Sequence, residues 1–389
     1  MKLYLREEYF GGVLYDPATA SYFNLGPEHV GELTEAARQQ TARRHGSWLT
    51  GILREEQSID LVMIRNPVAR PGVLSAPLKA FFNLTKRCNL YCAHCYNSSG
   101  EPDSPELGFA DIVAALEALH RHGVFKLTLA GGEPMFHRHF DDILGRLRAT
   151  DLAVSIVTNG ICITDDRAQL LGATASLRSV TVSLDGASPD TNDLVRGRGA
   201  FQRAVAGVRS LRRHYDRELA LRITLMRSNL GETDRFAELA DHLGASEIKV
   251  NSINPYGRAI GRDDLLIGNA EYVAARDRLA AAARRHGLPI EVPAHKYQRD
   301  ANDQVGLCRA GEETCEIDGD GRVFPCSFSF GRFCAGNLAA LPFTEILRTL
   351  QQHSIDDPWC LGCKGRGGKA EKVYGRVPKL VERVTAAGS

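Results

Sequence analysis

Residues 88–95 read Cys88-Asn89-Leu90-Tyr91-Cys92-Ala93-His94-Cys95 and place three cysteines in a CxxxCxxC pattern. Thiolates are the usual ligands of iron–sulfur clusters, and three of them can hold three irons of a four-iron cluster. The fourth iron is then open to chelate a small molecule that supplies nitrogen and oxygen donors. The alternative interpretation is a structural zinc or redox site, which would need a fourth nearby Cys or His in tetrahedral geometry.

A second motif, Gly131-Gly132-Glu133-Pro134, follows the apolar stretch 126–130. That stretch predicts a buried strand, so the glycines lie on a strand-end loop where backbone can approach a ligand closely. Glu133 would then be free to accept a hydrogen bond from an ammonium group of the ligand. Alone, the tetrad could be an ordinary turn, but together with the cysteine loop it favours the cluster over zinc.

With both motifs the chain resembles the radical S-adenosylmethionine (SAM) enzymes. The resemblance implies three ligands of a [4Fe-4S] cluster: Cys88, Cys92 and Cys95. It also implies that the amino and carboxylate groups of SAM bind the open iron, and that an electron from the cluster cleaves SAM to a 5′-deoxyadenosyl radical. His94 occupies the position that covers the adenine in this family, although it could equally be a solvated loop histidine.

Between residues 78 and 260 short apolar strands alternate with amphipathic helical stretches, which predicts a parallel βα barrel or an open α/β sheet. Helices are expected at 109–122 and near 140–149. The strands are expected at 80–84, 126–130, 153–157, 179–183, 220–225 and 247–250. These make about six βα units, and the resemblance implies a partial (βα)6 barrel with its ligands at the C-terminal strand ends.

Polar residues at those strand ends are the remaining candidates for the SAM site. The resemblance assigns Ser183 to the ribose hydroxyls, places Asn159 in the same pocket and pairs Arg196 with the SAM carboxylate, which suits a bidentate guanidinium. Asp185 belongs to the same Ser-Leu-Asp-Gly loop as Ser183. Strand-end Asn, Gly and Asp are also common turn residues for conformational reasons alone. Asn251 and residues 254–258 end the last strand in a similar way.

A second group of cysteines lies in residues 306–365. Asp320-Gly321 is a hairpin turn signal between 316–318 and 322–324, and this hairpin brings Cys308 and Cys326 to the same end. The arrangement resembles the twitch fold, a short form of the SPASM extension with one auxiliary [4Fe-4S] cluster. The resemblance implies four thiolate ligands: Cys308, Cys326, Cys360 and Cys363.

Some features of this region leave alternatives open. Residues 364–369 lack the further cysteines of a full SPASM domain, so a complete second auxiliary cluster is not expected. Cys315 and Cys334 are unassigned, and either could replace one of the four ligands or hold a small second cluster. A zinc ribbon is the alternative, because spacing alone does not distinguish zinc from iron.

The first 75 residues belong to neither part. Residues 6–17 and 20–25 predict two strands about a turn, followed by helices at 27–40 and 48–57. A hairpin followed by helices resembles the winged-helix-like peptide-recognition domain of ribosomal-peptide maturases, which takes a leader peptide as an extra strand. A cap over the open bottom of the barrel is the alternative. Residues 261–305 are expected to be a connecting segment and 366–389 a tail.

Length and composition agree with a multidomain enzyme. The chain has 389 residues, of which 43% are hydrophobic and 24% charged, and its net charge is +1. Near-neutral charge gives no case for nucleic acid or an acidic membrane as a partner, and no apolar run is long enough to span a bilayer. Ten cysteines without an apolar signal segment favour the reducing cytoplasm over a secreted disulfide framework.

Two functional classes would both use the 5′-deoxyadenosyl radical and would differ in their substrate. The leading hypothesis is modification of a ribosomally made precursor peptide, by crosslinking, epimerisation or another oxidation that begins with hydrogen abstraction. The partners would be that peptide and a reductant such as flavodoxin or ferredoxin. The alternative is oxidation or epimerisation of a small molecule such as an aminocyclitol or sugar. A third class, a non-catalytic iron–sulfur protein, is disfavoured by the intact cysteine triplet and Glu133.

Overall fold

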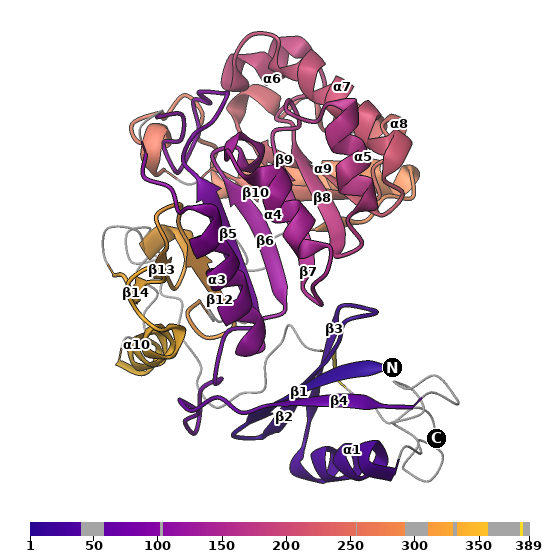
Figure 1. Cartoon of the computed structure of the whole chain (residues 1–389). Coiled ribbons are helices and arrows are strands. Elements are labelled where there is room, and N and C mark those ends of the chain that lie inside the picture. The colour runs from indigo at the N-terminus through magenta and orange to yellow at the C-terminus, as the bar shows by residue number, and fades with distance from the viewer. Residues whose placement is uncertain are drawn as a thin grey trace.

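A computed structural model describes residues 1–39, 58–101, 104–253, 255–291, 310–329, 333–356 and 382–383. The chain forms an N-terminal sheet at the bottom of Figure 1, a βα barrel above it, and a small C-terminal part beside the barrel. The strands form two sheets. The N-terminal sheet has five strands, and the barrel and C-terminal part share a sheet of ten.

The barrel strands are parallel and neighbour one another in chain order. They are β5 (Lys79–Thr85), β6 (Lys126–Gly131), β7 (Ala153–Thr158), β8 (Leu177–Ser183), β9 (Glu218–Leu225), β10 (Glu247–Ser252) and β11 (Ile290–Glu291). The helices are α3 (Phe109–Arg121), α4 (Phe140–Leu147), α5 (Asp165–Ala173), α6 (Pro189–Arg196), α7 (Ala200–His214), α8 (Thr233–His242) and α9 (Asn269–Arg285). The predicted parallel α/β architecture is confirmed, and each predicted strand lies within two residues of an observed one. The expected connecting segment 261–305 also contains α9 and β11.

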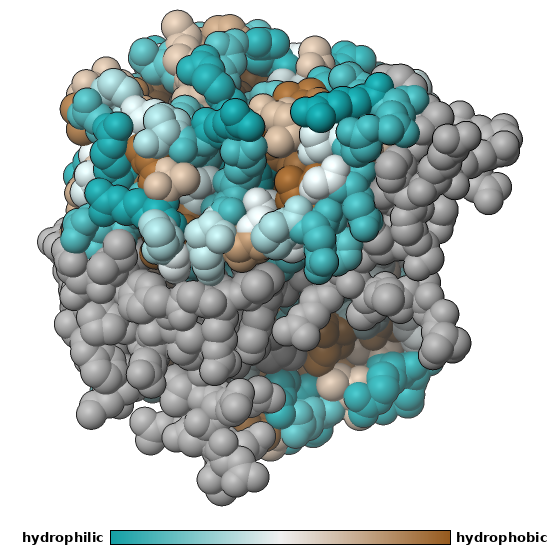
Figure 2. Space-filling model, turned by 90° about the horizontal axis from the view of Figure 1, so that it is seen from below, coloured by the Kyte–Doolittle hydropathy of each residue, from teal (hydrophilic) through white to brown (hydrophobic). Residues whose placement is uncertain are grey.

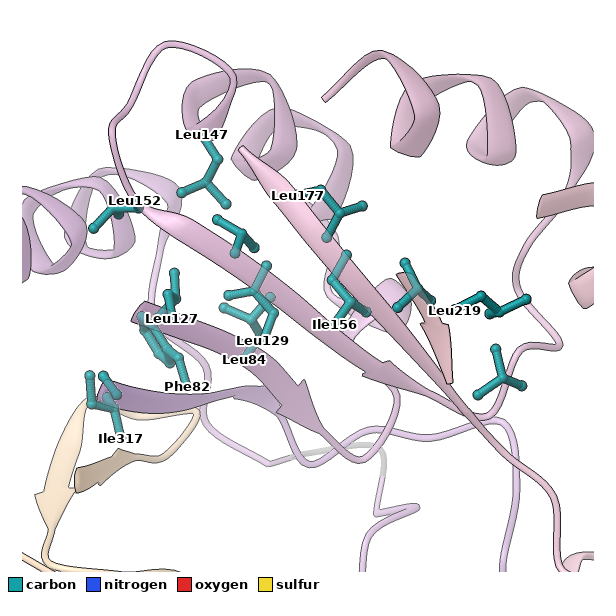
Figure 3. Close-up of a cluster of buried hydrophobic side chains, with 14 of the residues drawn as sticks. Phe82, Leu84, Leu127, Leu129, Leu147, Leu152, Ile156, Leu177, Leu219 and Ile317 are labelled. Atoms are coloured by element: carbon teal, nitrogen blue, oxygen red, sulfur yellow. The ribbon is translucent and has the colours of Figure 1, made fainter. Parts of the chain in front are cut away.

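Side chains alternate between the two faces of these strands. Outward residues such as Phe82, Leu129 and Ile156 are buried under the helices (Figure 3). Inward residues on the same strands, such as Asn83, Thr128 and Ser155, line a cavity instead. Parallel strands covered on both faces are usually apolar throughout. The polar inner face therefore marks a barrel whose interior is built to hold a polar ligand.

The C-terminal part extends the barrel sheet at its first strand. β12 (Thr314–Ile317) pairs in parallel with β5 and forms an antiparallel hairpin with β13 (Arg322–Phe324). β14 (Gly336–Asn337) and α10 (Phe343–Asp356) complete the part that the structure describes. Gly321 has a φ of +88°, as its turn requires, so the predicted hairpin is present.

The N-terminal sheet has the strand order β15-β3-β2-β1-β4. Its elements are β1 (Lys2–Glu8), β2 (Gly11–Asp16), β3 (Ser21–Leu25), α1 (Pro27–Gln39), β4 (Asp60–Ile64) and β15 (Glu382–Arg383). The expectation of only two strands was wrong, because a turn at Gly11, with a φ of +130°, divides the first one. β4 was not predicted, and the expected helix at 48–57 lies outside the described residues.

Both faces of the N-terminal sheet are buried. Leu3, Leu14 and Leu25 form one core with Leu33 of α1. Tyr15 on the opposite face stacks on Phe125 of the barrel with ring centroids 4.4 Å apart, and belongs to the barrel's own core. The domain therefore covers the N-terminal ends of the barrel strands, as the cap interpretation expects.

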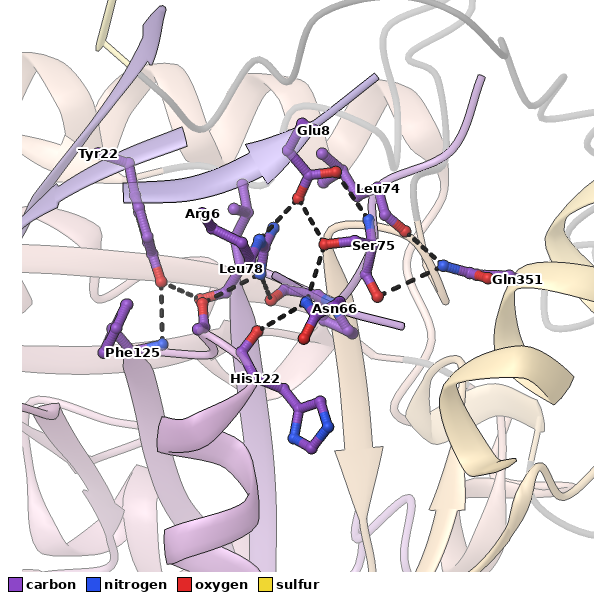
Figure 4. Close-up of polar contacts among 12 residues, drawn as sticks. Arg6, Glu8, Tyr22, Asn66, Leu74, Ser75, Leu78, His122, Phe125 and Gln351 are labelled. Carbon is purple, nitrogen blue, oxygen red and sulfur yellow. Dashed lines mark hydrogen bonds and ion pairs between the residues drawn. The ribbon is translucent and has the colours of Figure 1, made fainter. Parts of the chain in front are cut away.

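A buried polar network fixes this domain to both other parts (Figure 4). The Nε atom of Arg6 lies 2.6 Å from Glu8 Oε1, and each side chain is 1% exposed. Glu8 accepts from the backbone N–H and hydroxyl of Ser75, and Asn66 donates to that hydroxyl oxygen. Gln351 of α10 donates to the Ser75 carbonyl oxygen at 3.3 Å. Ser75 thus contacts the N-terminal domain and α10, while Arg6 donates to the barrel at the Gly123 carbonyl oxygen at 3.0 Å.

The coloured part of the face seen from below is predominantly polar (Figure 2). Residues coloured in the view from below are mainly hydrophilic, with small separated apolar spots (Figure 2). Among the residues that the structure describes, no helix has the length and hydropathy needed to cross a membrane.

Candidate functional site

A cavity of about 460 Å³ fills the barrel interior. Cys88, Cys92 and Cys95 all line it, so the three cysteines predicted to act together do face one space. This volume lies in the range of small-molecule sites. Residues from every strand between β5 and β11 reach the cavity, which extends from the cysteine loop down to the barrel floor.

Burial raises the pKa of the Cys88 thiol to about 12 and also raises that of Cys92. Iron would bind these side chains as thiolates, so cluster binding releases their protons. Backbone N–H groups of Leu90 and Ser99 point at the sulfurs of Cys88 and Cys95, each at 3.4 Å. Such donors stabilise negative charge on sulfur and suit cluster ligands.

Arg258 holds the cysteine loop in shape. Its guanidinium donates to the carbonyl oxygens of Cys92 at 2.9 Å and Ser99 at 2.7 Å, and lies 3.7 Å from the ring centroid of Tyr91. Neighbouring Gly257 has no room for a side chain, because a Cβ there would lie 2.5 Å from the Cys95 carbonyl oxygen. The sequence marked residues 254–258 only as a strand end, and nothing in it indicated this contact.

Gly131 and Gly132 line the cavity, but their close approach is to protein. A Cβ on Gly131 would lie 2.4 Å from the Thr85 carbonyl oxygen, and one on Gly132 would lie 2.3 Å from that of Arg87. The glycines are therefore needed to pack this loop against the segment that enters the cysteine loop. Because both glycines also line the cavity, the expectation that their backbone lets a ligand approach closely stays a prediction.

Glu133 is fully buried and already has hydrogen-bond partners. Its carboxylate accepts from the Thr158 hydroxyl and Asn159 N–H at 2.8 Å each, and from Met135 N–H at 3.3 Å. A carboxylate has about four acceptor sites and three are used, so the expected hydrogen bond from an ammonium group stays a prediction that rests on the remaining site. Burial raises the pKa of Glu133 to about 7. An ammonium group beside it would favour the charged form.

Asp185 brings His94 and Arg196 together at the cavity wall. Its Oδ2 atom lies 3.2 Å from His94 Nε2 and 2.8 Å from Arg196 Nη2. Burial alone would raise the pKa of Asp185, but Arg196 and then His94 hold it below its usual value. Burial also lowers the pKa of His94, so this ring is neutral near pH 7. Asp185 thus orients two predicted cofactor residues.

Ser183 and Asn159 line the same cavity as the cysteines. The Asn159 amide donates to Asn89 Oδ1 at 2.7 Å and lies 3.8 Å from Cys88 Sγ, which ties the third strand-end loop to the cysteine loop. The structure thus brings the predicted SAM residues around one space, with Glu133 and Asp185 behind its wall.

Buried polar atoms in this site fit a polar ligand. Among the described residues, His94 Nδ1 and Arg196 Nε are buried without a hydrogen-bond partner. Buried polar atoms of this kind are costly unless a ligand or water satisfies them. No three described His, Cys, Asp or Glu side chains are grouped to hold a single metal ion. A four-iron cluster does not need that grouping, because each thiolate binds a different iron.

The C-terminal cysteines differ in their surroundings. Cys315 lies on β12 in the barrel core and is 1% exposed, whereas Cys334 is exposed. Cys326 lies two residues after the end of β13, and the next two residues, Ser327 and Phe328, line the barrel cavity. A cluster on Cys326 would therefore lie beside that cavity. Three of the predicted ligands fall outside the described residues: Cys308, Cys360 and Cys363.

Two family models match the chain. Residues 82–242 match the radical SAM superfamily and residues 308–364 match the SPASM iron–sulfur cluster-binding domain. The mycofactocin maturase MftC of Mycobacterium ulcerans is 33% identical over 275 residues, which cover 68% of this chain and 72% of that protein. The AdoMet-dependent heme synthase of Methanosarcina barkeri is 29% identical over 347 residues, or 78% and 95% of the two chains.

The crystal structure of Streptococcus suis SuiB bound to the precursor peptide SuiA shares the fold. It has a TM-score of 0.68 at 14% identity and covers 94% of this chain and 89% of that one. The present chain is therefore an enzyme of the radical SAM superfamily with a C-terminal SPASM domain, and its cofactors are a [4Fe-4S] cluster, SAM and auxiliary iron–sulfur.

Proposed function

We propose that this enzyme abstracts hydrogen from a ribosomally made precursor peptide and so modifies it by crosslinking, epimerisation or another oxidation. The observation that carries the proposal is the 33% identity to mycofactocin maturase, which extends over 68% of this chain. Other relatives point the same way. The PqqA peptide cyclase of Rhizobium meliloti is 29% identical over 295 residues, and covers 73% of both chains.

In this proposal Cys88, Cys92 and Cys95 hold the radical cluster, which when bound supplies the electron that cleaves SAM. The protein's own part is to orient SAM and to keep water away from the radical. Gly131, Gly132 and the remaining acceptor site of Glu133 would receive its ammonium end. His94 and Arg196 both line the cavity and each has a buried polar atom without a partner, which supports their roles toward the adenine and the carboxylate of SAM.

We propose one auxiliary [4Fe-4S] cluster, held by thiolates from both ends of the SPASM domain. Its ligands would be Cys308, Cys326, Cys360 and Cys363. The core position of Cys315 argues against it as a ligand, because a cluster there would displace apolar packing. The cluster would take the electron left on the substrate after hydrogen abstraction. A flavodoxin or ferredoxin would reduce the radical cluster.

The N-terminal domain would hold the leader of the peptide by strand addition. Its sheet has two edges. β4 forms one edge. The other edge is formed by the two residues of β15, which pair in parallel with β3. A leader bound at β3 would replace β15, whereas one bound at β4 would not. Since this domain also covers the barrel floor, the cap and recognition roles are compatible.

A small-molecule substrate is the second candidate, and the heme synthase relative is the observation that favours it. That match covers 95% of the relative. The two candidates differ in whether a peptide is needed for product formation.

The test combines metal analysis with turnover. Anaerobically reconstituted protein should contain about eight irons per chain, four for each cluster. With dithionite and SAM it should form 5′-deoxyadenosine. Synthetic peptides encoded by short open reading frames beside the gene should acquire a mass change that depends on SAM. Deoxyadenosine without modification of any such peptide, but with oxidation of a small molecule, would refute the peptide proposal.

A further inference from the structure

We propose that Lys79 and Arg222, on opposite sides of the barrel interior, form an anion site that binds a carboxylate group of the substrate beside SAM. The inference rests on the proposed function and deepens it, because it specifies a chemical group that the substrate must carry. Both side chains line the cavity that contains the cysteine loop.

Arg222 is placed next to the expected cofactor end of the cavity. In the sheet register it neighbours Ser183 on β8 and Lys249 on β10. Its Nε atom is buried and has no hydrogen-bond partner among the described residues. Burial lowers the pKa of Arg222, and the negative charges of nearby groups, Glu291 foremost, offset this effect only in part. A guanidinium with a free fork is suited to a carboxylate.

Lys79 lies at the start of β5 and points into the same cavity. Its ammonium group lies 4.5 Å from the ring centroid of Phe81, and no described carboxylate lies within 4.0 Å of it. Burial lowers the pKa of Lys79 to about 8, and the nearby positive charge of Lys249 adds to this effect. At this pKa Lys79 still carries its charge near pH 7, and a bound anion would stabilise that charge.

The carboxylates near this site are committed elsewhere. Lys249 contacts Glu291 at 2.8 Å, Glu247 at 3.2 Å and Glu218 at 3.7 Å. Glu316 accepts from Asn83 at 2.6 Å and from Ser327, and burial raises its pKa toward the neutral form. Glu291 attracts both Lys79 and Arg222, but it is paired with Lys249, so no described carboxylate forms an ion pair with Lys79 or Arg222 inside the barrel.

Buried cations that lack a paired carboxylate are costly, so a site that retains two of them suits an anionic ligand. SAM carries a carboxylate of its own, but Arg196 at the cavity wall is already available for it. The remaining anion is a carboxylate of the peptide. It could be the C-terminal α-carboxylate or an Asp or Glu side chain, and the two sources share the same chemistry.

The test uses the reconstituted holoenzyme with SAM and without reductant, so that no turnover occurs. Four probes are titrated by ligand-observed NMR: N-acetylglycine, its neutral amide, N-acetylglutamic acid α-amide and N-acetylglutamine amide. At least one carboxylate probe should bind tenfold or more tightly than its neutral partner. Selective binding of N-acetylglycine assigns the site to a C-terminal carboxylate of the peptide. Selective binding of N-acetylglutamic acid α-amide assigns it to an Asp or Glu side chain. Equal binding of acids and amides would overturn the inference.

Variants locate the site. Arg222→Gln and Lys79→Gln should each weaken the preferred carboxylate probe about tenfold, whereas Arg209→Gln, an exposed change on α7, should alter it less than twofold. Arg222→Gln should leave SAM affinity within about twofold, and a tenfold loss of SAM affinity would assign this residue to the cofactor instead. Absence of SAM cleavage by the reduced wild-type protein would refute the proposed function, whereas cleavage without carboxylate selectivity would refute only this inference.

Discussion

Arg6→Met should be one of the most destabilising single changes in the N-terminal domain. The Arg6 guanidinium lies 2.6 Å from Glu8 and donates to the carbonyl oxygens of Pro77 and Gly123 at 3.0 Å each. Both partners of the ion pair are buried. Removing one partner of such a pair leaves an uncompensated charge and costs about 3–5 kcal/mol.

The groups around Arg6 determine where in the range of about 3–5 kcal/mol the loss of stability in Arg6→Met falls. Without Arg6, Glu8 still accepts from the N–H and hydroxyl of Ser75, so part of its charge stays solvated. The two carbonyl oxygens lose their donors, at about 1 kcal/mol each. Glu8→Gln in the Arg6→Met background should recover about 1–2 kcal/mol, because it removes the stranded charge and keeps an acceptor for Ser75.

Urea unfolding followed by far-ultraviolet circular dichroism would measure these free energies. Arg65→Met is the matched control, because Arg65 pairs with Glu7 at 2.8 Å on the surface of the same domain, with 77% of its side chain exposed. An exposed pair contributes about 0–1 kcal/mol. If Arg6→Met cost no more than Arg65→Met, or if the double variant were no more stable than Arg6→Met, the argument would be refuted.

Three further predictions concern the site. Gly132→Ala places a Cβ 2.3 Å from a carbonyl oxygen before the cysteine loop and should weaken SAM binding tenfold or more by calorimetry, whereas Gly145→Ala, which meets nothing within 4 Å, should not. Asp185→Asn should lower the free energy of unfolding by the largest amount above about pH 4. Because the pKa of Asp185 is lowered in the folded protein, this difference from wild type should shrink as the pH falls further. A difference that does not change with pH would contradict the prediction. Cys326→Ala should remove about four irons per chain by metal analysis, while Cys315→Ala should remove none.

Much of the barrel could be predicted from local patterns. Most barrel strands alternate apolar residues with polar ones, and this period of two is independent of distant contacts. The three clustered cysteines could likewise be assigned to one site, because three ligands within eight residues must lie close together.

The features that sequence reasoning missed depend on contacts between distant segments. Arg258 lies more than 160 residues from Cys92, whose carbonyl oxygen it binds. β4 has a strand partner only because β1 lies beside it. The engagement of Glu133 by Thr158 depends on the packing of one strand end against the next. The spacing of residues along the sequence does not predict such contacts.

The strand β5 connects the three parts of the molecule. Just before it, the Leu78 carbonyl oxygen accepts from Tyr22 of the N-terminal sheet at 2.6 Å. Within it, Asn83 donates to Glu316 of β12, and beyond its end the chain enters the cysteine loop. A shift of either flanking part would therefore displace the cluster ligands through one strand. The N-terminal domain and the SPASM hairpin are thus part of the framework that positions the radical site, so deleting either one should impair SAM cleavage as well as peptide binding.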